Sequence, residues 1–350
     1  MSLMWRWVKR AIAAFVLLSI GLLSPVAYSE VMCRPSDEPV ATQAMLDAAH
    51  HRPETRTLMT YPEWHIVHAY EDYGRVIQTG DPHDYGFTTA IGGFWRSLCA
   101  LSKASGELGA IDGGTKQMVY VIGVSFTAEL LAKAAYEETL GRLFAALRGP
   151  TRAPLDDVSA EQAQSYALFL RQVPWYKWDF HTDVETLETS DTGTLRDRER
   201  RIALGLEYRA KAAYAEIIAG AVAGVGADAR TLRMLVIGAS PGTLASLKGV
   251  TIVGETQNGI EIETPRYREL TQLMQEMAKS GINFVEIAGN DDIMFTILSD
   301  TAEHPKAIYS AARQGFDTYR HLILTQVSDL ASELRTLEDG GGRLEHIHDY

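Results

Sequence analysis

Two segments of the chain share the ten-residue pattern E-x-x-A-K-A-A-Y-x-E, at residues 129–138 and 207–216. Each copy offers a carboxylate, an ammonium group and a phenol at fixed spacing. Such groups could form buried salt bridges, or they could line the site of an enzyme or of a cofactor-binding protein. The candidate residues are Glu129, Lys133 and Tyr136 in the first copy and Glu207, Lys211 and Tyr214 in the second.

Both copies lie in long segments with helical periodicity. At 100° per residue, Glu129 and Lys133 share a stripe with apolar side chains, and so do Glu207 and Lys211. The other members of these stripes are Met118, Ile122, Phe126, Tyr136, Leu140 and Leu143 in the first segment, and Leu204, Tyr214, Ile218 and Val225 in the second. Unpaired charges in a protein core are costly, so we expect the charges to pair and the two helices to pack against one another.

Two interpretations of the repeat remain open. In the first, the charged residues form buried salt bridges that fix the register of the helices, since a Glu also pairs well with a Lys four residues later in one helix. In the second, the two facing helices enclose a polar site that belongs to an enzyme or to a cofactor or metal binder. The sequence does not identify a cofactor.

Histidines near the start of the first body helix form a weaker candidate site. His65, His68 and Asp72 lie on one side of this helix, with a spacing that could hold a metal ion. Arg75 lies on the same side, and the apolar face lies opposite. We therefore interpret these residues as a solvated polar face.

The remaining motifs do not indicate catalysis. His346 and His348 could bind a metal, but we expect them in a flexible tail after Gly340–Gly342. The segment Gly238–Gly242 lacks both the P-loop and the dinucleotide-binding spacing. The motifs G-x-S-x-G, H-E-x-x-H and C-x-x-C do not occur. Their absence favours a non-catalytic protein.

The first thirty residues resemble an export sequence. Arg6, Lys9 and Arg10 precede an apolar run over 11–23, and small residues before Glu30 fit a signal-peptidase site. The run is short for a membrane span, which needs about 17–25 residues. Both a cleaved signal peptide and an uncleaved anchor remain open. In either case, the positive flank stays in the cytoplasm and the body lies on the extracytoplasmic, periplasmic side.

The two cysteines, Cys33 and Cys99, are compatible with that compartment. An oxidising environment would let them pair and tie the N-terminal arm to the helical body. Two separate buried thiols are the alternative, because the sequence does not show that the residues are close in space.

The pattern of elements predicts an α+β fold, with a mainly helical N-terminal domain followed by a small α+β module. Helices are expected over about 60–79, 88–103, 116–147, 159–173, 195–225, 266–280 and 316–337, and strands over 232–237, 250–253, 260–263, 284–288 and 293–298. A small-residue hinge at 219–226 suggests a domain boundary. The predicted divisions are 1–29, signal peptide or anchor; 30–226, helical domain; 227–300, α+β module; and 301–350, C-terminal helix and tail.

Three motifs resemble a group of uncharacterised membrane-associated or exported bacterial proteins. They are TYPEWHIVH at 60–68, IGGFWRSLC at 91–99, and SFTAE at 125–129 running into Lys133 and Tyr136. The likeness covers roughly residues 55–225. It implies a shared fold and lends no known activity.

Composition narrows the classes of function. The chain has 350 residues, 46% of them hydrophobic and 22% charged, which is typical of a globular protein. Its net charge of −12 argues against nucleic acid as a partner. We expect a membrane-associated extracytoplasmic protein, a non-catalytic accessory or scaffold component with protein partners in the envelope. The alternatives are an enzyme or cofactor binder that uses the repeat, and a small-ligand binder that uses the α+β module.

Overall fold

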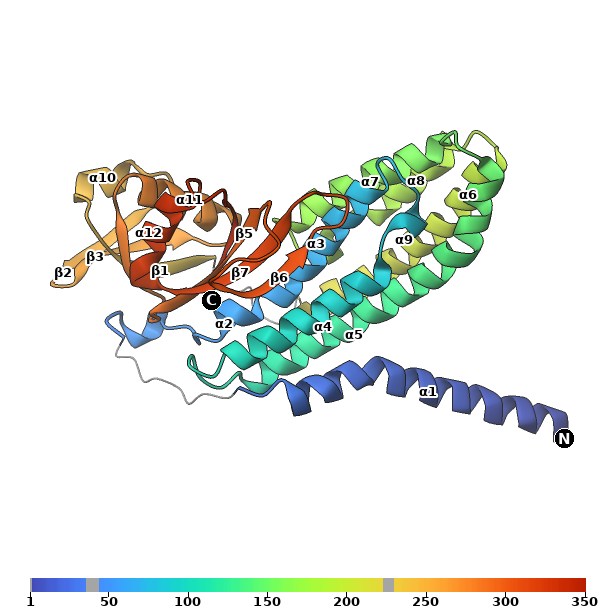
Figure 1. Cartoon of the computed structure of the whole chain (residues 1–350), viewed down its shortest axis with the longest axis horizontal. Helices are drawn as coiled ribbons and strands as arrows, with labels where there is room; N and C mark the ends of the chain where they lie inside the picture. The colour runs from blue at the N-terminus through green and yellow to red at the C-terminus, as the bar shows by residue number, and fades with distance from the viewer. Residues whose placement is uncertain (1, 36–43, 223–229) are drawn as a thin grey trace.

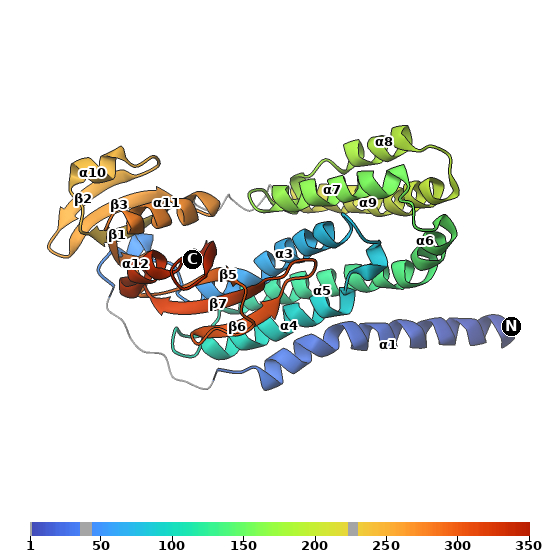
Figure 2. The ribbon, with the colours of Figure 1, turned by 45° about the horizontal axis from the view of Figure 1, so that its top comes forward.

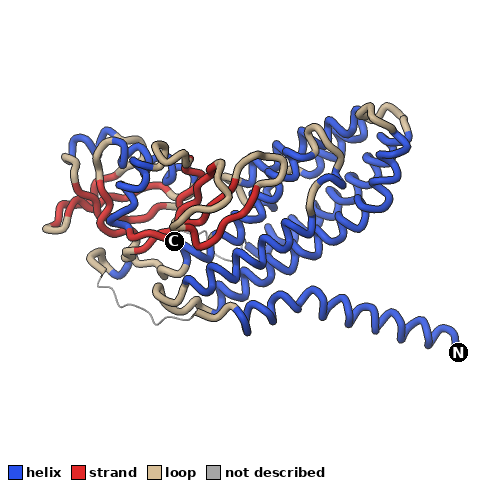
Figure 3. The backbone as a smooth tube through the Cα atoms, viewed as in Figure 1, coloured by secondary structure: helices blue, strands red, loops and turns tan. Residues whose placement is uncertain are grey.

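A computed structural model describes residues 2–35, 44–222 and 230–350. The N-terminal part forms a helical bundle. The C-terminal part forms two four-stranded antiparallel sheets, which pack together with short helices (Figures 1 and 3). A long apolar helix precedes the bundle. The predicted α+β class and the order of its two parts are confirmed.

Helix α1 (Ser2–Met32) lies apart from the bundle over most of its length (Figures 1 and 2). The helix continues through Pro25. Its C-terminal end contacts the bundle, where Cys33 forms a disulfide with Cys99 of α4 (Phe87–Ala104), with Cα atoms 4.9 Å apart. The predicted disulfide is confirmed.

The bundle is built from helices on both sides of α3 (Tyr61–Val76), which packs against α4, α5 and α7. Helix α9 packs against α6, α7 and α8 on the other side. The remaining bounds are α2 Arg56–Met59, α5 Gly113–Tyr136, α6 Arg142–Arg148, α7 Pro154–Leu170, α8 Phe180–Ser190 and α9 Leu195–Val222. Helix α8 was not predicted, because its polar sequence buries only a narrow face, including Phe180, Val184 and Leu187.

Helix α3 begins where the sequence predicts, but Thr60 does not cap it through its side chain. Helix α2 ends immediately before α3, and the Thr60 hydroxyl lies 3.1 Å from the Thr57 carbonyl and 3.3 Å from His348 Nδ1. Pro62 occupies the first turn, where a missing N–H costs nothing. The start of α3 is therefore tied to the C-terminal strand.

Helices α5 and α6 form one continuous rod joined by a π-helical turn, Glu137–Gly141. The Asp112 carboxylate caps its start by accepting the Thr115 N–H at 2.9 Å. Gly149, at φ 78°, ends it in a conformation that favours glycine. The predicted helix over about 116–147 is confirmed.

The first sheet has the strand order β2-β3-β1-β4, and the second has the order β6-β7-β5-β8. Helices α11 and α12 pack between the sheets and complete one apolar core, which includes Met274, Phe284, Phe295 and Leu330. The strands are β1 Thr231–Ile237, β2 Thr251–Thr256, β3 Gly259–Pro265, β4 Asn283–Ile287, β5 Asp292–Ser299, β6 Ala307–Ala312, β7 Tyr319–Gln326 and β8 Arg343–His348, and the helices are α10 Pro241–Ser246, α11 Arg268–Lys279 and α12 Val327–Thr336.

The prediction for residues 301–350 is wrong in two respects. The expected helix over 316–337 is strand β7 followed by the short helix α12, and the expected flexible tail is strand β8. Strands β7 and β8 both pair with β5, so a boundary at residue 300 would divide one sheet. The expected boundary at 226/227 lies outside the described residues.

The second sheet also covers the bundle. In β7, Ile323 faces the core shared with α11 and α12, whereas Leu322 belongs to the apolar cluster of the bundle. Met294 of β5 joins the same bundle cluster. With both faces buried, β7 lacks the alternation of a half-exposed strand, and this explains why its sequence reads as helical.

Candidate functional site

The charged residues of the repeat form a quartet that bridges α5 and α9. Lys133 Nζ lies 3.1 Å from Glu207 Oε1, and Lys211 Nζ lies 2.7 Å from Glu129 Oε1. Lys211 also pairs with Glu207 at 3.0 Å within α9. The predicted pairing is thus present, mainly between helices rather than within them. Each helix packs its backbone chiefly on other partners, α5 on α3 and α4, and α9 on α7 and α8.

Aromatic side chains enclose the quartet. The Tyr70 hydroxyl donates to Glu129, and Lys133 Nζ lies 4.4 Å from the centre of the Tyr73 ring. Lys211 lies 5.6 Å from the ring centre of Tyr166 on α7. These tyrosines come from other helices than the repeat, so the repeat alone does not reveal them. Their rings stabilise the two ammonium groups by cation–π attraction.

The electrostatics hold the quartet in its ionised form. Burial opposes ionisation of Glu207, but Lys133 and Lys211 outweigh it and lower its pKa to about 2. Burial would lower the pKa of Lys211, yet Glu129, Tyr70 and Glu207 raise it well above its ordinary value. A general acid or base works best with a pKa near the working pH. The quartet is therefore better suited to fixing helix register than to proton transfer.

The two tyrosines of the repeat lie outside the quartet. Tyr136 donates its hydroxyl to Glu199, whereas the Tyr214 side chain is 46% exposed and stacks on Trp175 with ring centres 5.3 Å apart. The predicted stripes are also partly wrong. Met118 of α5, Leu140 of the π turn and Leu143 of α6 are exposed, because neighbouring helices cover this rod on one side only. Val225 lies outside the described residues.

A second buried ion-pair network, which the sequence did not reveal, lies at the α6 end of the bundle. Arg200 pairs with Glu137 of the π turn at 2.9 Å and with Glu199. Arg196 pairs with Glu199 at 2.8 Å and with Asp156 at 2.9 Å. These charges partner one another across three helices. The charged run at 196–201 gives no indication of this in the sequence, since such runs commonly face solvent.

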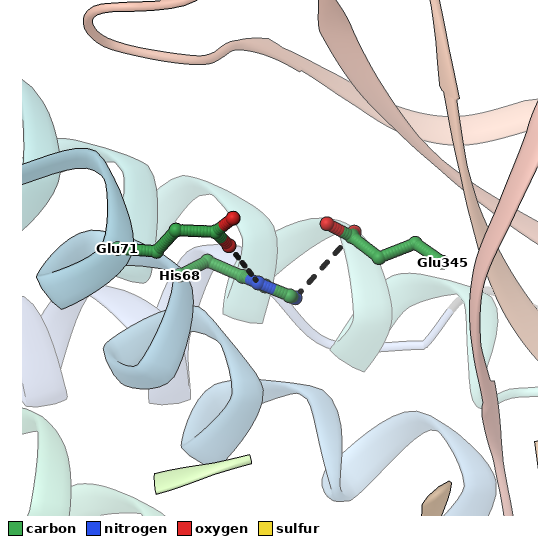
Figure 4. A group of neighbouring side chains, drawn as sticks. All are labelled: His68, Glu71 and Glu345. Carbon is green, nitrogen blue, oxygen red and sulfur yellow. Dashed lines mark ion pairs between the residues drawn. The ribbon is translucent and has the colours of Figure 1, made fainter. Parts of the chain in front are cut away.

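The histidine prediction is wrong in its environment. His68 and Asp72 are buried rather than solvated, because β8 and the β6–β7 connection of the second sheet lie against this side of α3. His65 Nε2 lies 2.9 Å from the Ala90 carbonyl and faces α4 instead. His68 lies between Glu71 of α3 and Glu345 of β8 (Figure 4). Glu345 is too distant in sequence for helical spacing to indicate it.

The flexible-tail prediction for His346 and His348 is also wrong. Both are buried on β8, where the His346 ring stacks on Trp64 with centres 3.8 Å apart. Thr271 Oγ1 lies 3.1 Å from His346 Nδ1. Burial lowers the pKa of His346 to about 3 and that of His65 to about 3. The α3–β8 junction is thus a buried histidine layer.

His68, Glu71 and Glu345 bring three potential metal-ligand atoms within 4.8 Å of one another. Two features make them a poor metal centre. The carboxylates approach different ring nitrogens, Glu71 near Nδ1 and Glu345 near Nε2. Both are already neutralised, Glu71 by Arg171 and Arg313, and Glu345 by Arg320. A dication would leave an excess of positive charge in a buried site.

The chain matches no protein family, no curated protein and no solved structure.

Proposed function

We propose that this chain is a membrane-anchored extracytoplasmic protein that acts as a non-catalytic scaffold or accessory component of an envelope complex. The proposal rests on the length, the exposed apolar surface and the covalent attachment of α1. Its apolar side chains are exposed from Trp5 to Met32, long enough for a bilayer, while its C-terminal end is bound covalently to the bundle. An apolar helix of this kind needs lipid or a partner around it.

The junction of α1 with the body favours an uncleaved anchor over a signal peptide. The predicted cleavage point follows Ser29, which is buried within the helix. Glu30 accepts a hydrogen bond from Tyr120 at 2.7 Å and lies 3.6 Å from Lys116 Nζ. Proteases prefer exposed, irregular chain, so this site is poorly presented once the body has folded. The cations Arg6, Lys9 and Arg10 would then lie in the cytoplasm.

Helix α5 is part of a second segment, Gly113–Arg148, that is long and apolar enough to cross a membrane by length and composition. We assign it to the bundle instead. It buries Val119, Phe126 and Leu130 against neighbouring helices, and it carries the charged quartet residues Glu129 and Lys133. If α1 alone crosses the membrane, the charged residues Glu129 and Lys133 stay out of the lipid, where charges are costly.

The outer face of α9 supports the scaffold role. Leu195, Ile202, Leu206 and Ile217 lie on one stripe of the helix and are 57–68% exposed. Exposed apolar side chains that line up in this way are typical of protein–protein contacts. The ion pairs of the interior also favour a non-catalytic role, since paired charges are poor general acids and bases. The resemblance to exported bacterial proteins is consistent with this proposal.

The topology is tested with one added cysteine in the full chain. Asn258→Cys lies in the exposed β2–β3 turn and leaves the native disulfide intact. A membrane-impermeant maleimide should label it in intact spheroplasts, whereas Trp5→Cys should be labelled only after lysis. Labelling of Asn258→Cys only after lysis would reverse the topology. The mass of the purified protein separates the two N-terminal forms, because cleavage before Glu30 would remove 29 residues.

The scaffold role is tested by site-specific photocrosslinking in cells. A photoreactive residue at Leu206 should give discrete crosslinked species with envelope proteins. The matched control is Glu185, which is exposed on the neighbouring polar helix α8. Equal patterns at the two positions, or none at Leu206, would count against a partner-binding face on α9.

A further inference from the structure

His68 occupies an unusual position between two carboxylates that come from different parts of the fold. Its Nδ1 lies 3.9 Å from Glu71 Oε2 on the same helix, and its Nε2 lies 3.6 Å from Glu345 Oε2 on β8 (Figure 4). The side chain is 3% exposed, and both ring nitrogens lack a hydrogen-bond partner. Glu71 Oε2 is also buried without a partner.

A neutral His68 has one N–H donor too few for the two carboxylates that face its ring. A neutral imidazole has one N–H donor and one acceptor nitrogen, whereas an ionised carboxylate only accepts. With neutral His68, one ring nitrogen therefore turns its lone pair toward a carboxylate. An imidazolium has two donors and could satisfy Glu71 and Glu345 together.

The surroundings keep that proton on the ring rather than on a carboxylate. Burial opposes the ionisation of Glu71, but His68, Arg171 and Arg313 outweigh it, and its pKa falls to about 2. Arg320 donates to Glu345 through Nε and Nη2 and holds the pKa of this buried group well below its ordinary value. Both carboxylates thus stay ionised over the range in which histidine titrates.

Other charges bear on His68 as well. Burial and then Arg320 lower the pKa of His68 below its ordinary value, and they outweigh Glu345 and Glu71, which raise it. Asp72 and His65 lie near His68 on α3, and His346 and His348 lie on β8. His65, His346 and His348 are not flanked by two carboxylates, and this distinguishes His68 from them.

We propose that His68 is a proton-binding site that joins the bundle to the second sheet. As the pH falls below the ordinary pKa of histidine, the ring takes up a proton and donates to both Glu71 on α3 and Glu345 on β8. The other buried histidines of the junction take up a proton only at lower pH. The site is independent of where the protein resides, so it does not rest on the proposed function.

The protonation order is tested by NMR titration of the histidine rings in the full chain in detergent micelles. His68 should protonate at a higher pH than His65, His346 and His348. Glu345→Gln and Glu71→Gln should each reduce its proton affinity about tenfold, which corresponds to one pKa unit. The control Glu338→Gln, at an exposed carboxylate paired with Lys279, should leave it unchanged.

Three results would overturn the proposal. His68 could titrate together with or below the other three rings in the unsubstituted chain, a readout that needs no variant to fold. The two Glu→Gln variants could fold and yet leave its midpoint unchanged. Finally, elemental analysis could find a stoichiometric metal whose removal by a chelator shifts the His68 signals, which would assign the site to a metal instead.

The structural consequence is tested by hydrogen exchange of the β8 amides at pH 7 and pH 5, corrected for intrinsic exchange rates. His68→Gln keeps a polar side chain that cannot be protonated. Because the pKa of His68 lies below its ordinary value, protonation of its ring costs stability. Acid should therefore reduce β8 protection less in His68→Gln than in the unsubstituted chain. Equal losses in the two proteins would show that the His68 proton does not act on this strand.

Discussion

Two of the polar junctions among the described residues solve the same problem differently. The quartet between α5 and α9 brings two carboxylates and two ammonium groups together with complementary partners. The histidine junction between α3 and β8 leaves buried atoms of His68, Glu71 and His348 without hydrogen-bond partners. Because unpaired buried groups are costly, the first junction is a locked connection, whereas the second can change its state with one proton.

The comparison is tested most strongly by removing one charge from the quartet. Lys133→Met should lower the free energy of unfolding by about 3 kcal/mol, because Glu207 then keeps only Lys211 in a largely buried position. Changing Glu207 to Leu as well should recover much of this loss, since the remaining Lys211–Glu129 pair is balanced. Chemical denaturation of the three proteins measures both effects.

The matched control for this series is Arg142→Met, which breaks an exposed pair with Glu138 four residues earlier in the same continuous helical rod. Exposed pairs of this kind contribute about 0.3–0.5 kcal/mol. A Lys133→Met variant as stable as the Arg142→Met control would mean that the quartet is solvated. Both interpretations of the repeat would then fail.

Acid should weaken the two junctions in different pH ranges. The folded-state pKa of His65 and of His346 is depressed to about 3, so their stabilising contribution is complete above the unfolded value of about 6.5 and is lost as the pH falls toward 3. At pH 5 each histidine should account for about 2 kcal/mol of lost stability. Glu207, with a pKa of about 2, keeps its contribution until the pH falls below about 4.5.

Hydrogen exchange at pH 7 and pH 5, followed separately for peptides from β8 and α9, measures this difference. Protection in β8 should fall while that in α9 is retained. His346→Gln removes one of the titrating groups and should make the β8 response shallower. A parallel loss in both segments would mean that the two junctions do not respond independently.

Much of the architecture follows from local sequence, but the junctions require knowledge of tertiary contacts. The helices 88–103 and 116–147 and the strands 232–237 and 293–298 are found close to where periodicity places them. By contrast, strand β7 was predicted as helix because both of its faces are buried. Local periodicity reports the exposure of a segment, and it fails where a second element covers the other face.

The candidate sites show the same limit. The pairing of Glu129, Lys133, Glu207 and Lys211 could be predicted because four charges on apolar stripes need partners. The burial of His68 could not, because Glu345 and the covering sheet lie far along the chain. The polar side of α3, which the sequence predicts to face solvent, instead contacts polar groups of the second sheet inside the protein.

The smallest predicted effect separates the two tyrosines that the repeat makes equivalent in sequence. Tyr136 donates to the buried Glu199, so Tyr136→Phe should lower the free energy of unfolding by about 1.5 kcal/mol, the lower end for a hydrogen bond to a charged group. Tyr214 keeps its ring contact with Trp175 after Tyr214→Phe, and its hydroxyl has no role in the quartet, so the change should stay within about 0.5 kcal/mol. Denaturant titration of the two single variants and of the double variant provides the measurement. Equal losses from the two substitutions would mean that the two tyrosines are equivalent, as the repeat suggests. Such a result would contradict the exposed position of the Tyr214 side chain.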